Sequence, residues 1–306
     1  MTLPKSVLGK TGLLVSRLGA GLSEIGYELT LSEVEQAGRV LNTALDLGIN
    51  FLDTSACYGI SEELIGRTVA HRRAEYVLAT KCGHVAGEYK GEPWTAQTVT
   101  DSIDRSLKRL RTDYLDLVQL HSCGVDVLER GEVIAALLAA RDAGKTRFVG
   151  YSGDNEAALW AVESGHFDTL QTSFNLVDQR ARFELFPKAV EREMGIIAKR
   201  PIANAAWGAK RSPSDYAEPY FRRAQAMIDP GPIPGAPENG VLLALGFVAA
   251  HAEVDTMIVG TKNPAHMRQN IEWMAGEGDA LPLSEETVAA LRERFEALGS
   301  DWEQKT

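Results

Sequence analysis

The chain has 306 residues, of which 44% are hydrophobic and 24% are charged, and its formal net charge is -10. These proportions are typical of a globular protein that can bury a core without disulfides. The negative charge excludes a nucleic-acid backbone as the main partner, because phosphates require a basic surface. No apolar run reaches the length of a membrane span. The presence of only three cysteines and the lack of a secretory leader predict a reducing, cytoplasmic setting. The sequence does not indicate an oligomeric state.

Residues 5–15 predict a β-hairpin around Gly9-Lys10-Thr11-Gly12 that plugs one end of the fold. Eight short β-like runs follow the start of the chain, most of them continuously apolar, as in parallel strands buried on both faces. The runs are residues 15–18, 49–52, 76–79, 114–120, 147–151, 169–173, 196–198 and 257–259.

Helical patterns separate these runs. Ser32 and Glu35 fit a capping box before an apolar helix face, and Gly144 suits the end of a later helix. Strands alternating with helices predict a parallel sheet, either closed as a (β/α)8 barrel or open and doubly wound. The even spacing favours the barrel, as one domain over residues 1–306. Residues 203–237 predict a long irregular loop, and the last 25 residues predict an extra C-terminal helix.

Four polar side chains follow three consecutive strand runs: Asp53 and Tyr58 the second, Lys81 the third and His121 the fourth. In a barrel the C-terminal ends of the strands form the active-site rim, so these side chains should converge. A buried ammonium lowers the pKa of a neighbouring phenol, which makes Tyr58 a candidate general acid. Asp53 would neutralise Lys81, and His121 would orient a substrate oxygen. A single strand-end residue of this kind is usually structural, whereas four together predict a site that polarises a carbonyl while a cofactor delivers hydride.

These residues lie within longer motifs, and with them the sequence resembles the aldo-keto reductase family over nearly the whole chain. The motifs are Leu18-Gly19-Ala20-Gly21, Asn50-Phe51-Leu52-Asp53-Thr54-Ser55 with Tyr58-Gly59, Glu63-Leu64-Ile65-Gly66, Thr80-Lys81, Asp113-Tyr114-Leu115-Asp116-Leu117 with Gln119-Leu120-His121, Gly144-Lys145 with Gly150-Tyr151-Ser152, and Gln171 with Asn175. The resemblance implies a (β/α)8 barrel, carbonyl reduction with NADPH-type cofactors, and Asp53, Tyr58, Lys81 and His121 as the catalytic residues.

The resemblance also implies a cofactor site along the strand ends, with NADPH favoured and NADH use open. Ser152 and Gln171 would bind the nicotinamide carboxamide, with Gly21, Leu22 and Asp53 beside the ring. Gly153 stands where the family commonly has Asn, and Lys199 stands where many members place a stacking aromatic residue. Further cofactor contacts are expected from Lys199, Arg200, Pro201 and Ile202, and from Gly260, Thr261, Lys262, His266, Gln269 and Asn270.

Two loop tryptophans, Trp94 and Trp207, are expected to join Tyr58 and His121 in lining the substrate pocket. Cys57, Cys82 and Cys123 all lie near the catalytic strand ends, which suggests either small packing residues or partial sensitivity to oxidation. Gly19-Ala20-Gly21 does not complete a dinucleotide fingerprint, and the histidine spacing predicts no metal site. A nucleotide-binding regulatory subunit, like channel-associated proteins that resemble this family, stays as the alternative to an enzyme acting on a small carbonyl or alcohol.

Overall fold

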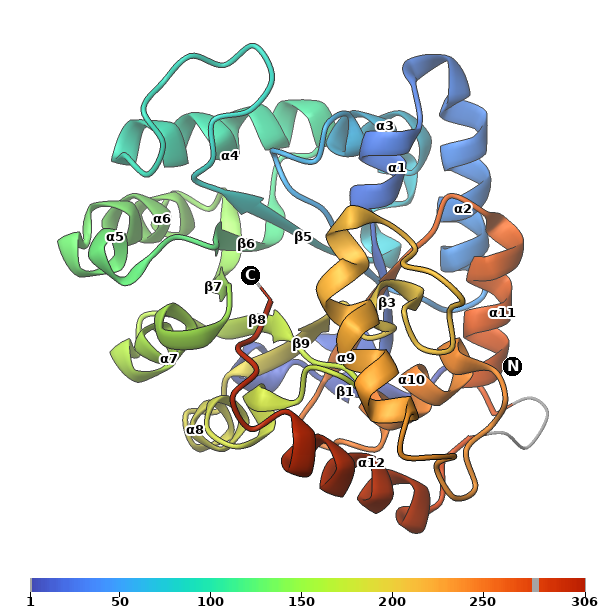
Figure 1. The fold of residues 1–306 in the computed structure, drawn as a ribbon. Coiled ribbons are helices and arrows are strands. Elements are labelled where there is room, and N and C mark those ends of the chain that lie inside the picture. The colour runs from blue at the N-terminus through green and yellow to red at the C-terminus, as the bar shows by residue number, and fades with distance from the viewer. Residues whose placement is uncertain (1, 277–280, 306) are drawn as a thin grey trace.

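The computed structural model describes residues 2–276 and 281–305, so parts of the predicted 1–306 domain (residues 1, 277–280 and 306) lie outside the described residues. Eight parallel strands close into a barrel in the order β10-β3-β4-β5-β6-β7-β8-β9, with helices packed around it (Figure 1). The predicted (β/α)8 barrel is therefore confirmed. The barrel strands are β3 Leu18–Gly21, β4 Phe51–Asp53, β5 Val77–Cys82, β6 Leu115–His121, β7 Thr146–Ser152, β8 Thr169–Ser173, β9 Gly195–Lys199 and β10 Thr256–Gly260.

The predicted N-terminal hairpin is also confirmed. Strand β1, Lys5–Val7, pairs with β2, Leu14–Ser16, and a short 3-10 turn, Gly9–Thr11, connects them. Apolar side chains of the hairpin share a small core with the inward-facing residues of the barrel strands. The backbone N–H of Lys10 bonds to the carbonyl of Glu193, just before β9 begins, at 2.6 Å. The hairpin therefore closes the end of the barrel opposite the predicted site.

One predicted strand is wrong in its placement. The run over residues 15–18 is not one strand but the end of β2 and the start of β3, separated by Arg17. The guanidinium of Arg17 donates to the carbonyls of Ala249, His251 and Val254 at 3.0–3.1 Å. The chain turns from hairpin to barrel at this anchored residue, which an apolar pattern alone does not reveal.

The helices lie outside the barrel strands (Figure 1). Their bounds are α1 Ser23–Glu28, α2 Val34–Asp46, α3 Ser61–Thr68, α4 Ala96–Leu110, α5 Val125–Arg130, α6 Glu132–Asp142, α7 Asn155–Ser164, α8 Leu185–Glu191, α9 Glu218–Ile228, α10 Gly240–Ala249, α11 Pro264–Met274 and α12 Glu285–Leu298. Helix α12 is the predicted C-terminal helix. Within residues 2–276 and 281–305, no helix has both the length and the apolar character needed to cross a bilayer.

Two local predictions need correction. The capping box is formed by Thr30 and Glu33, not Ser32 and Glu35, because a 3-10 turn precedes α2. Residues 203–237 are not irregular throughout, since α9 occupies their middle. Pro219 in the first turn of α9 is compatible with a helix, because the N–H that proline lacks would have no partner there.

Candidate active site

The structure brings Asp53, Tyr58, Lys81 and His121 together at the C-terminal ends of β4, β5 and β6. The Lys81 ammonium lies 2.6 Å from Oδ2 of Asp53 and 2.9 Å from the carbonyl oxygen of Thr54. It lies 4.9 Å from the centre of the Tyr58 ring. The rings of Tyr58 and His121 are 5.5 Å apart and nearly perpendicular. Lys81 and Asp53 are buried, whereas Tyr58 and His121 are partly exposed and can meet a substrate.

Burial and charge set the protonation of these groups. Burial opposes the Lys81 ammonium, but Asp53 and Tyr58 outweigh it and raise the pKa of Lys81. Burial also raises the pKa of Tyr58, and Lys81 offsets this only in part. The prediction of a lowered phenol pKa is therefore wrong. Burial, followed by the charge of Lys81, holds the pKa of His121 well below its ordinary value. Tyr58 is thus a protonated phenol and His121 a neutral imidazole at neutral pH.

Helix α1 packs against the turn of residues 57–59, which carries Tyr58. A Cβ at Gly26 would lie 2.1 Å from the carbonyl oxygen of Tyr58, and one at Gly59 would lie 2.3 Å from that of Gly26. Gly59 also has a φ of +52°, which favours glycine. The Tyr27 hydroxyl donates to the carbonyl of Cys57 at 2.9 Å. The backbones of α1 and the turn are therefore in direct contact. This contact fixes the position of the Tyr58 backbone.

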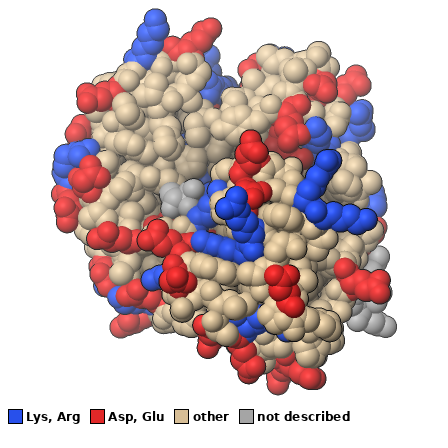
Figure 2. Space-filling view, viewed as in Figure 1, with Lys and Arg blue, Asp and Glu red and all other residues tan. Residues whose placement is uncertain are grey.

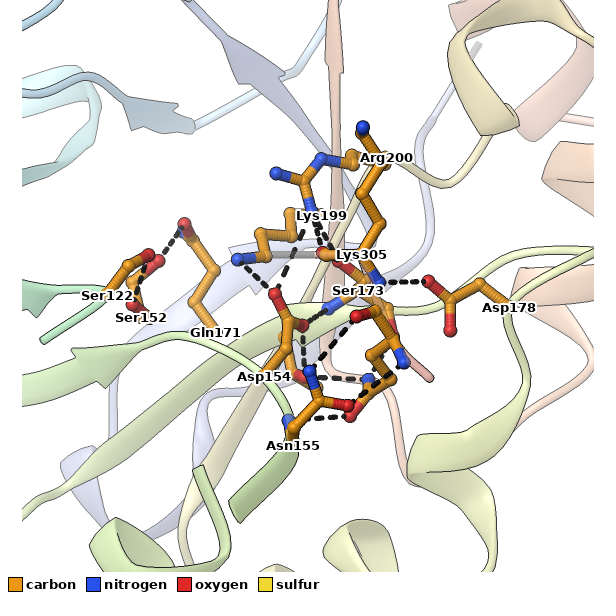
Figure 3. Close-up of polar contacts among 12 residues, drawn as sticks. Ser122, Ser152, Asp154, Asn155, Gln171, Ser173, Asp178, Lys199, Arg200 and Lys305 are labelled. Atoms are coloured by element: carbon orange, nitrogen blue, oxygen red, sulfur yellow. Dashed lines mark hydrogen bonds and ion pairs between the residues drawn. The ribbon is translucent and has the colours of Figure 1, made fainter. Parts of the chain in front are cut away.

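Gln171 connects the predicted nicotinamide residues to the catalytic four. Its Nε2 donates to Oδ1 of Asp53 at 2.8 Å. Its Oε1 accepts from the hydroxyl of Ser152 at 2.9 Å (Figure 3). The sequence predicted both residues but not the bond to Asp53. Ser152 Oγ and Gln171 Oε1 each retain a lone pair, which suits the N–H groups of a primary carboxamide. The residues present therefore fit the nicotinamide that the resemblance implies.

A second buried cluster occupies the ends of β7, β8 and β9 (Figure 3). The ammonium of Lys199 lies 2.8 Å from Oδ2 of Asp154, so a cofactor phosphate would compete with this carboxylate for it. Arg200 donates to Ser173 Oγ at 2.6 Å and also bonds the carbonyl of Lys305 and the hydroxyl of Tyr216. Pro201 is buried and Ile202 half-buried beyond them.

The segment after α12 returns to this cluster, which the sequence did not predict. Nε2 of Gln304 donates to Thr172 Oγ1 at 3.0 Å and to the Ser173 carbonyl at 2.8 Å. The backbone N–H of Lys305 donates to Asp178 at 3.1 Å. We call residues 302–305 the C-terminal segment. Its contacts place it at the barrel mouth, where Figure 2 shows Lys and Arg side chains gathered beside a central hollow.

The remaining predicted cofactor residues lie beside β3 and β10. Gly21 and Gly260 pair at the strand ends, and the N–H of Leu22 donates to the carbonyl of Asp53 at 2.9 Å. Lys262 is paired with Glu28 of α1, with 2.6 Å between the charged atoms. A phosphate would therefore compete with Glu28 for this ammonium. Thr261 and Asn270 are buried, whereas His266 and Gln269 are exposed.

The two predicted pocket tryptophans differ. The Trp94 ring covers Gly83, and its centre lies 4.7 Å from that of His84, which in turn lies 5.1 Å from that of His121. Sequence reasoning missed His84, although it follows the same strand as Lys81. Trp207 instead approaches the start of α10, with its Cδ1 3.2 Å from a Cβ built at Gly240. Ring contacts thus connect Trp94 to His121 through His84, whereas Trp207 packs at the start of α10.

The cysteines divide by exposure. Cys82 and Cys123 are buried, and burial raises the pKa of both thiols, that of Cys123 to about 12. Cys57 is half-buried beside His121, and burial raises its pKa as well. Thiols are less reactive than thiolates, so the predicted sensitivity to oxidation is not favoured for Cys82 and Cys123.

Among the described residues, no group of histidine, cysteine and carboxylate side chains could hold a metal ion.

Comparison with known proteins establishes the family. The model of the "Aldo/keto reductase family" matches residues 17–294, so the chain belongs to the aldo/keto reductase family. L-galactose dehydrogenase of Arabidopsis thaliana is 29% identical over 95% of this chain and 94% of its own. The holo form of an aldo-keto reductase from Bacillus halodurans superposes with a TM-score of 0.79 at 24% identity, covering 95% and 96% of the two chains. An aldo-keto reductase from Klebsiella pneumoniae in complex with NADPH superposes with a TM-score of 0.72 at 24% identity, covering 96% and 95%.

Proposed function

We propose that this protein is an NADP(H)-dependent oxidoreductase that interconverts aldehydes or ketones and alcohols, with Tyr58 as the general acid or base. The observation that carries the proposal is the buried Lys81–Asp53 pair beneath a partly exposed phenol and a neutral imidazole. That the chain is an oxidoreductase of this family follows from the family match. The roles of the individual residues are our proposal.

The chain's residues divide the proton chemistry among them. When bound, the nicotinamide supplies or accepts the hydride. In reduction, Tyr58 donates its phenolic proton to the substrate oxygen as negative charge develops there. Lys81 stabilises the phenolate that remains, and Asp53 keeps the ammonium charged and in place. In the reverse direction the phenolate accepts the proton, and the same ammonium lowers the cost of forming it.

The cofactor would lie along the strand ends. Ser152 and Gln171 would hold the carboxamide, while Gly21, Leu22 and Asp53 lie beside the ring. We propose NADPH, supported by the Klebsiella neighbour that contains it, and include NADH because Lys262 is already paired. Contacts to the rest of the cofactor are proposed from Lys199, Arg200, Pro201, Ile202, Gly260, Thr261, Lys262, His266, Gln269 and Asn270.

The substrate is proposed to be a short or sugar-like carbonyl compound or the corresponding alcohol. The relative from Arabidopsis is named for the oxidation of a sugar, and His84 adds a polar ring beside His121. Trp94 would form one wall of the pocket and Trp207 a more distant one. The alternative of a regulatory subunit is not favoured, since the catalytic four converge and none of the relatives named above is described as a channel subunit.

The proposal is tested by titrating the protein with NADPH and NADH, followed by fluorescence, and then adding a panel of aldehydes and sugars. Tyr58→Phe should lower kcat by a factor on the order of 10² to 10⁴ and leave the nucleotide Kd unchanged, because only the acid is removed. Tyr114→Phe is the matched control, as its half-exposed phenol lies at the start of β6, at the far end of the barrel. Wild-type kcat in Tyr58→Phe, or no binding of either nucleotide, would overturn the proposal.

A further inference from the structure

Two side-chain atoms, a hydroxyl oxygen and a thiol sulfur, lie within hydrogen-bond distance of one nitrogen of His121. Nδ1 of His121 lies 3.2 Å from the hydroxyl of Ser55 and 3.3 Å from the thiol of Cys57. The hydroxyl and the thiol are themselves 3.2 Å apart. Ser55 is buried, and the backbone N–H of Cys57 donates to its hydroxyl oxygen at 3.3 Å. Ser55 and Cys57 belong to the turn that carries Tyr58, so this turn contacts both the acid and the imidazole.

The hydrogens in this cluster can be assigned from chemistry. His121 is a neutral ring with one N–H, because burial and the charge of Lys81 lower its pKa. Cys57 stays a thiol, because burial raises its pKa. Ser55 and Cys57 therefore each bring a hydrogen to the cluster, and Nδ1 is the acceptor that both can reach. The Ser55 oxygen already accepts the Cys57 N–H, which favours its role as a donor toward the ring.

We propose that Ser55 and Cys57 are positioning residues: one of them at a time donates to the single lone pair of Nδ1 of His121, and this fixes the ring hydrogen on Nε2. Which ring nitrogen carries the proton is set by the hydrogen bond at the other nitrogen. The Nε2–H tautomer can donate to a substrate carbonyl oxygen beside Tyr58. The opposite tautomer would present a lone pair to that oxygen and repel it. The proposal rests on the proposed function for its consequence in catalysis, but not for the tautomer itself.

The tautomer can be measured without turnover. The sequence has six histidines, so ¹⁵N-histidine labelling and long-range ¹H–¹⁵N correlation spectra at pH 7.5 give few signals, and His121→Asn assigns the one of interest. We expect the Nε2–H pattern in the wild type, and a shift toward Nδ1–H in Ser55→Ala/Cys57→Ala. Cys57→Ser should keep the wild-type pattern, because it retains a donor. An Nδ1–H wild type, or a double variant with an unchanged pattern, would overturn the proposal.

Kinetics provide the second readout. The double variant should lose on the order of 10- to 100-fold in kcat, because the donor to the reacting oxygen is no longer directed. Cys57→Ser should stay within about twofold of the wild type, and Cys123→Ser is the matched control for a cysteine away from His121. A loss of kcat equal in Cys57→Ser and the double variant would contradict the donor role. Circular dichroism checks folding, and Ser55→Ala/Cys57→Val, which also removes both donors, replaces the double variant if that variant fails to fold. Should the wild type reduce no carbonyl yet show the expected tautomers, the proposed function fails and this assignment stands.

Discussion

Two buried aspartate–lysine pairs lie across the barrel mouth from each other, and their surroundings make them different. Asp53–Lys81 joins β4 and β5 at 2.6 Å, and Asp154–Lys199 joins the ends of β7 and β9 at 2.8 Å. Lys81 has Tyr58 beside it, and its pKa is raised. Burial, with the positive charge of Arg200 added, lowers the pKa of Lys199 despite Asp154. The first pair lies beside the phenol of Tyr58. In the second pair, Asp154 accepts from Thr172 and Ser173, and these two residues bind the C-terminal segment.

We expect the largest effect from a substitution that breaks the Asp53–Lys81 pair. Lys81→Met removes the charge that stabilises the phenolate of Tyr58 and leaves Asp53 unpaired. We expect kcat to fall by a factor on the order of 10² or more, measured by steady-state kinetics with NADPH. An isothermal titration with NADPH shows whether the protein is still competent to bind. Unaltered kcat would remove Lys81 from the mechanism.

Breaking the second pair should affect stability instead. Lys199→Met leaves the buried carboxylate of Asp154 without its main partner, at a cost of about 3 kcal/mol in the free energy of unfolding. Urea unfolding followed by circular dichroism measures this. The double variant Asp154→Asn/Lys199→Met should recover part of the loss, since no unpaired charge remains. If the single and double variants are equally unstable, the ion pair is not what stabilises this side of the mouth.

The buried carboxyl of Asp178, which accepts from the C-terminal segment, adds a pH dependence on the second side. Burial raises the pKa of Asp178 to about 7, from an ordinary value of 3.8, although Tyr220 and the Lys305 N–H both donate to it. The folded protein therefore binds more protons here than the unfolded chain between these values. Stability from Asp178 is present at low pH and is lost as pH rises toward 7. Between pH 5.5 and 7 the wild type should lose about 1–2 kcal/mol relative to Asp178→Asn, measured by urea unfolding. Parallel pH profiles of the two proteins would contradict this.

The smallest expected effect concerns the cofactor beside the first pair. Glu28→Gln frees Lys262 from its 2.6 Å partner, so a 2′-phosphate no longer competes with a carboxylate. We expect the Kd for NADPH to fall by about fivefold, within the range of partly exposed ion pairs, while that for NADH changes little. Glu35→Gln is the control, because it replaces an exposed carboxylate on α2 with the same carboxamide. An equal change for both nucleotides would show that Glu28 does not distinguish them.

The two sides also differ in how far the sequence predicts them. Asp53, Tyr58, Lys81 and His121 each end a local apolar run, so the barrel rule alone brings them together. The contact between Asn155 and Gln304 spans 149 positions, and nothing local in either segment indicates it. His84 could have been found, because it follows the same strand as Lys81. The pairing of Lys262 with Glu28 could not, since it depends on where α1 leaves the barrel. The raised pKa of Tyr58 depends on burial, which the sequence does not provide.

Helix α1 has a consequence for how this protein can change over evolution. One end of its six residues carries Glu28 at the proposed cofactor phosphate, and its middle carries Gly26 and Tyr27 against the turn of Tyr58. A substitution selected for a new nucleotide preference therefore acts on the same short rigid piece that places the acid. If Glu28 and Tyr58 have the roles proposed above, a change of cofactor preference at one end of α1 is made in the helix whose other residues contact the turn of the acid.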